Sequence, residues 1–312
     1  MRKIWCVFFL TLSFGRLNAQ DQTPLTHEVR LVVDNDVFTS LYRDQYYTSG
    51  LFGYYRKWIP VDKNFKLIRS FSLNQRMYTP RLVSWSDTLD FDRPYAGLLS
   101  AFIDHEFYLA QARYLKLSFE LGWMGGATKT AEIHQFWHRV LQMPIPSGWD
   151  YQINNSPVMN FYGTYVQTIA AGEFADMATE SNVAFGTIYS NVRQEILFRL
   201  GVISPLDRSV HYNGQLGNEG ATFDSKQPTE FYVFAAPGLE FNQYNATIEG
   251  NLFGIESTHT EASSRWIFQQ KFGVMVSWSV IDATLTYYVR SKETAEAFPH
   301  FYGGLHLNYR FK

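Results

Sequence analysis

The stretch Arg113-Tyr-Leu-Lys-Leu-Ser-Phe-Glu-Leu-Gly-Trp123 alternates between two kinds of residue along its length. In an extended chain successive side chains point to opposite faces, so Leu117, Leu121 and Trp123 share one face while Glu120 lies on the other. Residues 268–279 and 283–290 alternate in the same way. This pattern is typical of a strand in the wall of a transmembrane β-barrel, whose outer face meets lipid and whose inner face is polar.

Stretches of similar pattern recur along the whole chain. The candidate strands are residues 27–36, 47–58, 66–78, 95–110, 113–126, 157–170, 176–188, 193–203, 229–244, 264–279, 281–292 and 301–312. Many approach the ~10 residues that a tilted strand needs to cross a bilayer. Short connections at 110–113 and 279–280 contrast with long segments at 37–46, 79–94, 127–156, 204–228 and 245–263. We therefore predict an all-β fold, a transmembrane antiparallel barrel of about twelve strands with its long loops on one rim.

A soluble β-sandwich would also contain alternating strands, because one face of each of its sheets packs against a core. Paired aromatic residues favour the barrel, since Tyr and Trp gather where a membrane meets water. Such pairs lie near the ends of candidate strands, at Tyr46-Tyr47, Tyr54-Tyr55, Tyr287-Tyr288 and Phe301-Tyr302. Since no linker or internal repeat divides the chain, we expect residues 20–312 to form a single outer-membrane barrel domain.

The N-terminal segment 1–19 has the composition of a secretory signal peptide. A basic start at Met1-Arg-Lys3 precedes an apolar run, and Ala19 offers a small residue at a cleavage point. Cys6, the only cysteine, would leave with this segment, so the exported chain would have no thiol for a disulfide or a cysteine-ligated metal. Three of the 27 Lys and Arg lie in this segment, and the remaining 24 against 29 Asp and Glu give a mature net charge of −5. That balance argues against a nucleic-acid partner.

One of the long segments contains a predicted helix. Residues 128–142, within the 127–156 loop, have few β-branched positions. Their apolar residues recur at helical spacing, at Ile133, Trp137, Val140 and Leu141. His134 and His138 are four residues apart and would share one helical face. Because imidazole is the usual proton acceptor in hydrolysis, this helix is the first candidate for chemistry.

Two polar clusters lie where the first two strands meet. Asn35 and Asp36 end the first strand, and their oxygens suit a hard cation such as calcium. Asn and Asp also stabilise ordinary turns, so a plain loop start explains them as well. Thr48 begins the next antiparallel strand and could present its hydroxyl near Asp36. An ordinary strand start would account for Thr48 too.

A third cluster brackets the 79–94 loop. Arg76, Arg81 and Arg93 could bind phosphate or carboxylate groups of an anionic headgroup, because guanidinium forks match those oxygens. The alternative is that Asp92-Arg93-Pro94 forms a turn with a local ion pair.

Six short motifs follow one another along the chain. They are Asn35-Asp36, Tyr46-Tyr-Thr-Ser-Gly50, Gln75-Arg-Met-Tyr-Thr-Pro80, Asp92-Arg-Pro-Tyr-Ala-Gly97, His138-Arg139 and Gly148-Trp-Asp-Tyr-Gln152. Their ordered combination resembles the lipid A 3-O-deacylase (LpxR) family of outer-membrane enzymes. The resemblance implies a twelve-stranded barrel and a calcium-dependent esterase that removes the 3′-linked acyloxyacyl group of lipid A. The expected partners are lipid A or lipopolysaccharide and the outer membrane, and we expect a monomer.

The resemblance also assigns roles by position. It implies that His138 is the general base, that Asn35 and Asp36 form an active-site pair that binds Ca²⁺, and that Thr48 supplies a hydroxyl. A His base and a Lewis-acidic calcium ion would together activate water and stabilise an oxyanion. The chain departs from the family at His134, where many members have Gln, and at Pro144, where one branch has an acidic residue. Its 79–94 loop also lacks that branch's Lys-Arg pair.

Three other functions remain open. The histidine pair resembles zinc spacing, but the metalloprotease pattern needs Glu after the first His, and position 135 is Gln. A serine-dependent outer-membrane phospholipase would need a Ser–His pair, and no serine has a distinctive setting. A passive porin or structural barrel is the third, although large side chains expected to face inward predict a largely filled lumen. These are Arg69, Glu120, Arg199 and Glu240.

Overall fold

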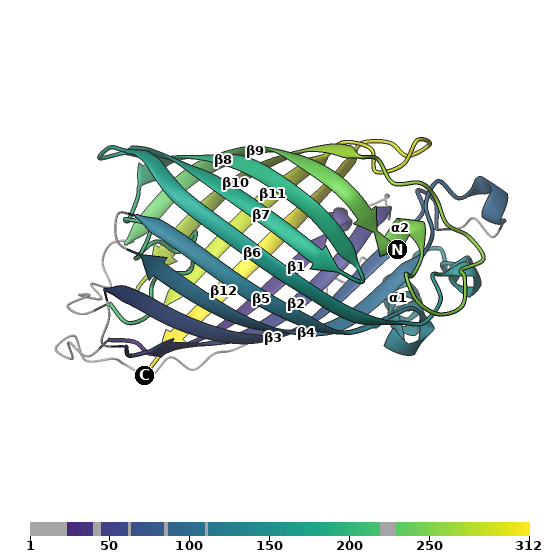
Figure 1. Ribbon diagram of the computed structural model, residues 1–312, viewed down its shortest axis with the longest axis horizontal. Helices are drawn as coiled ribbons and strands as arrows, with labels where there is room; N and C mark the ends of the chain where they lie inside the picture. The colour runs from purple at the N-terminus through teal and green to yellow at the C-terminus, as the bar shows by residue number, and fades with distance from the viewer. Residues whose placement is uncertain (1–23, 40–44, 62–63, 84–86, 110–111, 219–228) are drawn as a thin grey trace, which may run out of the picture.

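Twelve antiparallel strands close into a barrel in which chain neighbours pair with each other and β1 pairs with β12 (Figure 1). The computed structural model describes residues 24–39, 45–61, 64–83, 87–109, 112–218 and 229–312. The predicted signal peptide at 1–19, with Cys6, lies outside these residues. The strands are β1 (His27–Asn35), β2 (Tyr46–Ile59), β3 (Phe65–Thr79), β4 (Ala96–Leu109), β5 (Arg113–Met124), β6 (Ser156–Ala171), β7 (Ala175–Gly186), β8 (Tyr189–Val202), β9 (Glu230–Asn245), β10 (Trp266–Trp278), β11 (Ile281–Arg290) and β12 (His300–Phe311). The predicted all-β barrel is confirmed.

The helices are short and lie in the connections between strands. The predicted helix is confirmed as α1 (Thr130–Leu141), between β5 and β6, and α2 (Ala246–Glu249) follows β9. Single 3-10 turns are η1 (Asp36–Phe38), η2 (Thr88–Asp90), η3 (Gly126–Thr128) and η4 (Trp149–Tyr151). Within the described ranges, no helix has the length and apolarity to cross a membrane.

The two ends of the barrel carry different connections. We call the end with α1 and α2 the loop end and the opposite end, where the chain enters β1 and leaves β12, the turn end (Figure 1). One prediction about the loops was wrong, because the long segment 204–228 joins β8 to β9 at the turn end. Only Thr187 and Ile188 join β7 to β8 at the loop end. The rim is set by strand order, since every connection from an even to an odd strand lies at the turn end, whatever its length.

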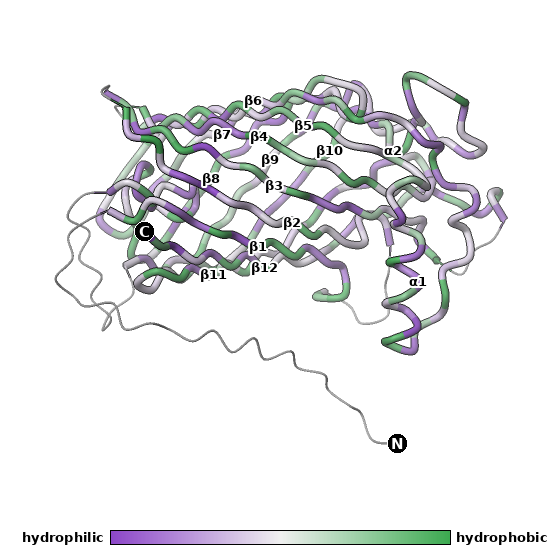
Figure 2. Tube along the Cα trace, turned by 90° about the horizontal axis from the view of Figure 1, so that it is seen from below, coloured by the Kyte–Doolittle hydropathy of each residue, from purple (hydrophilic) through white to green (hydrophobic). Residues whose placement is uncertain are grey.

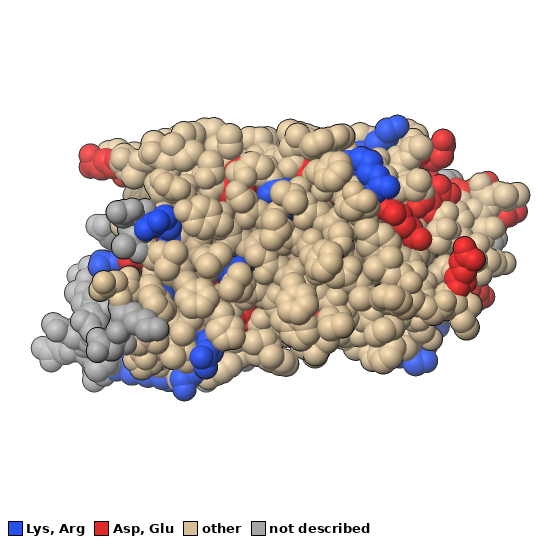
Figure 3. Space-filling model, in the orientation of Figure 1, with Lys and Arg blue, Asp and Glu red and all other residues tan. Residues whose placement is uncertain are grey.

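The outer surface is an apolar belt. On β5, Leu117, Leu121 and Trp123 each expose about half of their surface (48%, 51% and 55%), while Glu120 is buried. The same alternation runs along the other strands (Figure 2). Charged residues gather toward the two ends of the visible face, and its middle is mostly uncharged (Figure 3). This is the surface expected of a barrel that spans a bilayer.

Paired charges fill much of the lumen. Arg56 is buried, and its Nη1 donates to Glu28 Oε1 at 2.6 Å while its Nη2 donates to Glu106 Oε2 at 3.0 Å. Of the four side chains predicted to point inward, Glu120, Arg199 and Glu240 are buried. Arg69 was placed on the wrong face: it is exposed, because it has the same strand parity as Phe71 and Leu73 on the outer face of β3.

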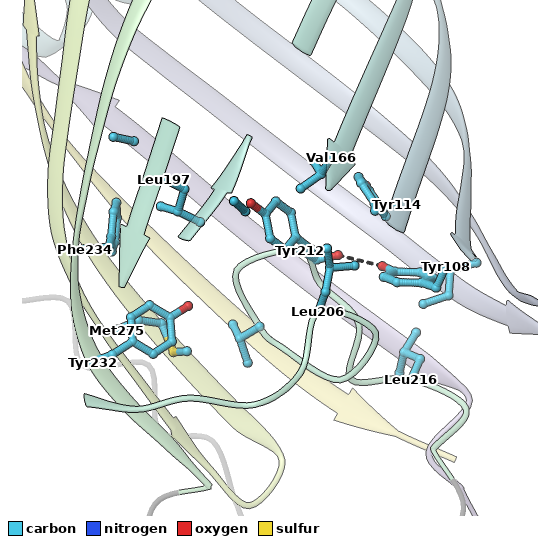
Figure 4. Packing of buried hydrophobic residues seen from close by; sticks show 14 of the residues in the cluster. Tyr108, Tyr114, Val166, Leu197, Leu206, Tyr212, Leu216, Tyr232, Phe234 and Met275 are labelled. Atoms are coloured by element: carbon cyan, nitrogen blue, oxygen red, sulfur yellow. Dashed lines mark hydrogen bonds between the residues drawn. The ribbon is translucent and has the colours of Figure 1, made fainter. Parts of the chain in front are cut away.

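The segment between β8 and β9 folds back into the lumen. Four of its side chains are buried and belong to one apolar cluster with residues of the wall: Leu206, Val210, Tyr212 and Leu216 (Figure 4). The Tyr108 hydroxyl donates to the Tyr212 carbonyl oxygen at 2.6 Å. We call residues 203–217 the lumen segment. Cavities of about 320 Å³ and about 200 Å³ remain in the lumen, and the second borders this segment. The filling supports the predicted narrow lumen rather than an open pore.

Candidate active site on the outer face of the barrel

Helix α1 packs against the outside of the barrel wall at the loop end. Gln75 Nε2, on the outer face of β3, donates to Thr130 Oγ1 at 3.3 Å. The helix can approach closely because Gly97 of β4 has no side chain; a Cβ there would lie 2.5 Å from Thr130 Cβ. The buried residues of α1 are Thr130, His134 and His138, at a spacing of four, so one face of the helix lies against the protein.

Apart from Glu132 and Arg139, the exposed residues of α1 are apolar. Its large hydrophobic side chains are Ile133, Phe136, Trp137, Val140 and Leu141, each between 39% and 60% exposed. A helix with one polar, buried face and one apolar, exposed face suits the boundary between headgroups and acyl chains of a membrane. The two histidines therefore lie between the barrel wall and a helix that can contact lipid.

Both histidines are held in defined orientations. Their rings meet edge to face, with centroids 4.4 Å apart and an interplanar angle of 87°. Trp149 Nε1 donates to His134 Nδ1 at 3.1 Å. His138 Nδ1 lies 2.5 Å from the carbonyl oxygen of Pro144, which can only accept, so Nδ1 carries the hydrogen. The basic nitrogen of a neutral His138 is then Nε2, as a general base requires.

Pro144 and Trp149 were not predicted as partners of the histidines. Pro144 stands where one branch of the family has an acidic residue, and its backbone carbonyl contacts His138 without any acidic side chain. Trp149 belongs to a buried group on the outer face, the outer-face cluster, which consists of Met77, Phe91, Tyr95 and Trp149. Trp149 belongs to the Gly148–Gln152 motif, which the sequence had singled out. Only the fold shows that its indole N–H contacts His134.

Thr48 lies on the same outer face. It is the extra residue of a β-bulge in β2, two residues after Tyr46, whose φ of 61° is in the left-handed region. Its hydroxyl oxygen lies 2.7 Å from that of Thr79 on β3. Thr79 and Met77 are two residues apart on β3, so both point outward, and Met77 belongs to the outer-face cluster. The fold therefore brings Thr48 to the part of the wall that supports the histidines.

Asn35 and Asp36 lie at the adjacent end of β1. Asn35 pairs with Ser49, the residue after Thr48, and its Oδ1 caps η1 by accepting from the backbone nitrogen of Val37 at 2.8 Å. Asp36 is buried, and its Oδ2 accepts from the backbone nitrogen of Gln45 at 2.6 Å. The pair does stabilise a turn, as the simpler interpretation proposed, and it lies at the same end of the barrel as Thr48.

The donor atoms of this pair match a hard cation in kind. Carboxylate and amide oxygens are calcium ligands, whereas zinc favours the nitrogen and sulfur donors of His and Cys. Among the residues that the structure describes, no group of three or more His, Cys, Asp or Glu side chains could hold a metal. A calcium ion here would therefore also need other oxygen ligands, such as backbone carbonyl groups or water. Within the described residues the histidine pair has no third His, Cys, Asp or Glu ligand for zinc.

The three arginines are not brought together. Arg76 points into the lumen, where it pairs with Glu120. Arg93 is buried; its Nη1 donates to Glu293 Oε2 at 2.8 Å and its Nη2 to Thr247 Oγ1 at 2.9 Å. The proposed local ion pair at Asp92-Arg93 is thus replaced by contacts between three loops. Only Arg81 remains at the surface, with its guanidinium 4.2 Å from the centroid of the Phe298 ring.

Glu293 is charged despite its burial. Burial alone would raise the pKa of its carboxyl group, but the positive charges of Arg93 and Arg290 lower that pKa below its usual value. The ion pair therefore holds the β11–β12 connection against the β3–β4 connection at neutral pH.

These features define a class of protein, an outer-membrane β-barrel with a histidine-bearing helix against its outer wall. The family model for the outer membrane protein LpxR matches residues 4–311. The chain therefore belongs to the LpxR family. No curated protein matches its sequence.

Solved structures agree with this fold. LpxR from Salmonella typhimurium has a TM-score of 0.71 and 19% identity, with 91% of this chain and 100% of that chain covered. The translocator domain of the autotransporter NalP from Neisseria meningitidis has a TM-score of 0.41 and 11% identity, with 94% of this chain and 90% of that chain covered. The likeness to LpxR from Salmonella typhimurium establishes that the two chains share the same barrel fold.

Proposed function

We propose that this protein is an outer-membrane esterase that removes the 3′-linked acyloxyacyl chain from lipid A. Membership of the LpxR family supports a lipid A deacylase. The observation that carries the proposal is the position of His138, held between the outer wall of the barrel and a helix with an exposed apolar face. An enzyme that cuts a membrane-embedded lipid needs its base on the lipid-facing side. We further propose that the monomer is active.

The chemistry follows from the orientation of His138. Nδ1–H is held by the Pro144 carbonyl, so Nε2 can take a proton from a water molecule. The resulting hydroxide adds to the ester carbonyl carbon and forms a tetrahedral oxyanion. Collapse of this intermediate breaks the bond to the sugar oxygen, which takes the proton from Nε2 of the imidazolium. The products are a free fatty acid and a sugar hydroxyl.

Thr48 and Asn35 are suited to stabilise the developing charge. The Thr48 hydroxyl can donate a hydrogen bond to the oxyanion when Thr79 donates to Thr48 in turn. The amide NH₂ group of Asn35 can donate to the oxyanion, while its Oδ1, which accepts from Val37, has a second lone pair for a cation. Asp36 and Asn35 would hold a calcium ion together with backbone carbonyl oxygens, and a bound calcium ion supplies Lewis acidity for the ester carbonyl.

Mass spectrometry of lipid A tests the proposal. Lipid A from a bacterial host that expresses this chain should lose the mass of the 3′-linked acyloxyacyl group, and an Asp36→Ala variant of equal abundance should leave lipid A intact. Unchanged lipid A with the native chain in the outer membrane would refute the activity. Loss of an acyl chain from a different position would support the esterase activity but would assign the cleavage to that other position.

A further inference from the structure

An apolar groove of about 440 Å³ lies on the outer face of the barrel, beside the candidate site. It runs over β10, β11 and β12. Its walls include aromatic and aliphatic side chains that are about half exposed: Phe38, Phe272, Leu285 and Tyr287. Because these side chains belong to the apolar belt, the groove opens toward the acyl chains of the membrane.

Gly303 gives the groove its depth. It has the same strand parity as Leu305 and Leu307, so it lies on the outer face of β12, where it adds no side chain. A Cβ at this position would lie 2.7 Å from Phe38 Cβ. The phenylalanine can therefore pack directly on the backbone of β12 and form one end of the groove.

The groove is continuous with the candidate site. Gly303 pairs with Asn35 across the β1–β12 ladder. Phe38 belongs to η1, the same turn as Asp36, and the Thr39 hydroxyl fixes this turn to β12 by donating to the Phe301 carbonyl oxygen at 3.2 Å. One short turn thus presents Asp36 and closes the end of the groove.

We propose that this groove, here the outer groove, binds an acyl chain of the lipid substrate, with the ester end at Asn35–Asp36 and the methyl end toward the membrane centre. This inference rests on the proposed function and names the part of the substrate that the groove takes. Its lining is apolar and its surroundings are lipid, so an alkyl chain is the ligand that matches it. Since the chain is already in an apolar medium, the groove contributes orientation rather than affinity.

A kinetic comparison tests the role in orientation. Leu285→Trp fills the groove, and Leu117→Trp is the matched control, an exposed leucine in the middle of β5. We expect Leu285→Trp to lower kcat/KM on long-chain lipid A by about 10-fold, as for other misfits in apolar pockets. It should have little effect on an analogue whose cleaved chain is short, and Leu117→Trp should match the native chain on both. Equal loss on both substrates, or no loss with Leu285→Trp, would overturn the proposal.

A second measurement does not depend on activity. Lipid A with a photoreactive diazirine in its 3′-linked chain is cross-linked to the His138→Ala barrel in lipid vesicles, and the labelled peptides are mapped. Preferential labelling of residues 272–305 over β5 supports the groove, whereas labelling spread evenly around the belt refutes it. Preferential labelling with no hydrolysis by the native chain would keep the groove and refute the proposed function.

Discussion

Replacing His138 by alanine should remove most of the activity and leave the barrel intact. The side chain is buried between α1 and the wall, so the substitution removes the proposed base, its bond to Pro144 and its contact with His134. Loss of a general base lowers kcat by ~10²–10⁴-fold, which is about 3–5 kcal/mol of transition-state stabilisation. The barrel should keep its stability because α1 lies outside the wall.

His134→Ala is the matched control, since the two histidines share one helical face. It leaves the buried indole N–H of Trp149 without its described acceptor, which costs about 1–3 kcal/mol of local stability. The base remains, however, so the loss of kcat should be much smaller. A second variant, His138→Gln, keeps an N–H group near the Pro144 carbonyl but cannot take a proton, and should be as inactive as His138→Ala.

The assay is the initial rate of lipid A deacylation in detergent micelles, followed by mass spectrometry, with heat-modifiable electrophoretic migration as the measure of folding. The native rate should also fall on acidification, because a protonated imidazole cannot accept a proton. Wild-type rates from His138→Ala, or equal losses from His134→Ala and His138→Ala, would refute the assignment of the base.

Three further outcomes are expected. EGTA should abolish deacylation and calcium, but not zinc, should restore it; restoration by zinc alone would favour a histidine metal site. Arg93→Ala should destabilise the loop end by about 1–3 kcal/mol in urea unfolding, because buried Glu293 loses one of its two arginine partners and keeps only Arg290. Since the pKa of Glu293 is lowered, this contribution should be present at neutral pH and be lost as the pH falls through that lowered pKa. Finally, the native barrel should not conduct as an open pore in planar bilayers, whereas steady conductance would favour the porin alternative.

Local alternation was sufficient to predict the wall of the barrel. A strand with one face in lipid and one in a polar lumen must alternate with a period of two, and that period is visible in a single stretch such as 113–123. The helix at 130–141 was equally predictable, because its apolar residues follow the helical period. The six ordered motifs were enough to indicate the family.

Contacts between distant residues were decided only by the tertiary structure. Arg76 and Gln75 are adjacent in sequence, yet Arg76 faces Glu120 in the lumen and Gln75 faces α1 outside. Strand alternation already places these two adjacent side chains on opposite faces, but the distant residue that each one contacts depends on how the sheet closes. The same holds for the segment 204–228, whose rim depends on the number of strands before it.

The sequence by itself determined that this chain forms an outer-membrane barrel with a histidine-bearing helix, because strand and helix periods are local properties of the chain. Only closure of the barrel placed that helix on the outer wall, set Pro144 and Trp149 against the histidines, and joined the Asp36 turn to an apolar groove on β12. Such contacts arise from the register and curvature of twelve strands acting together, and each depends on residues far apart in the sequence.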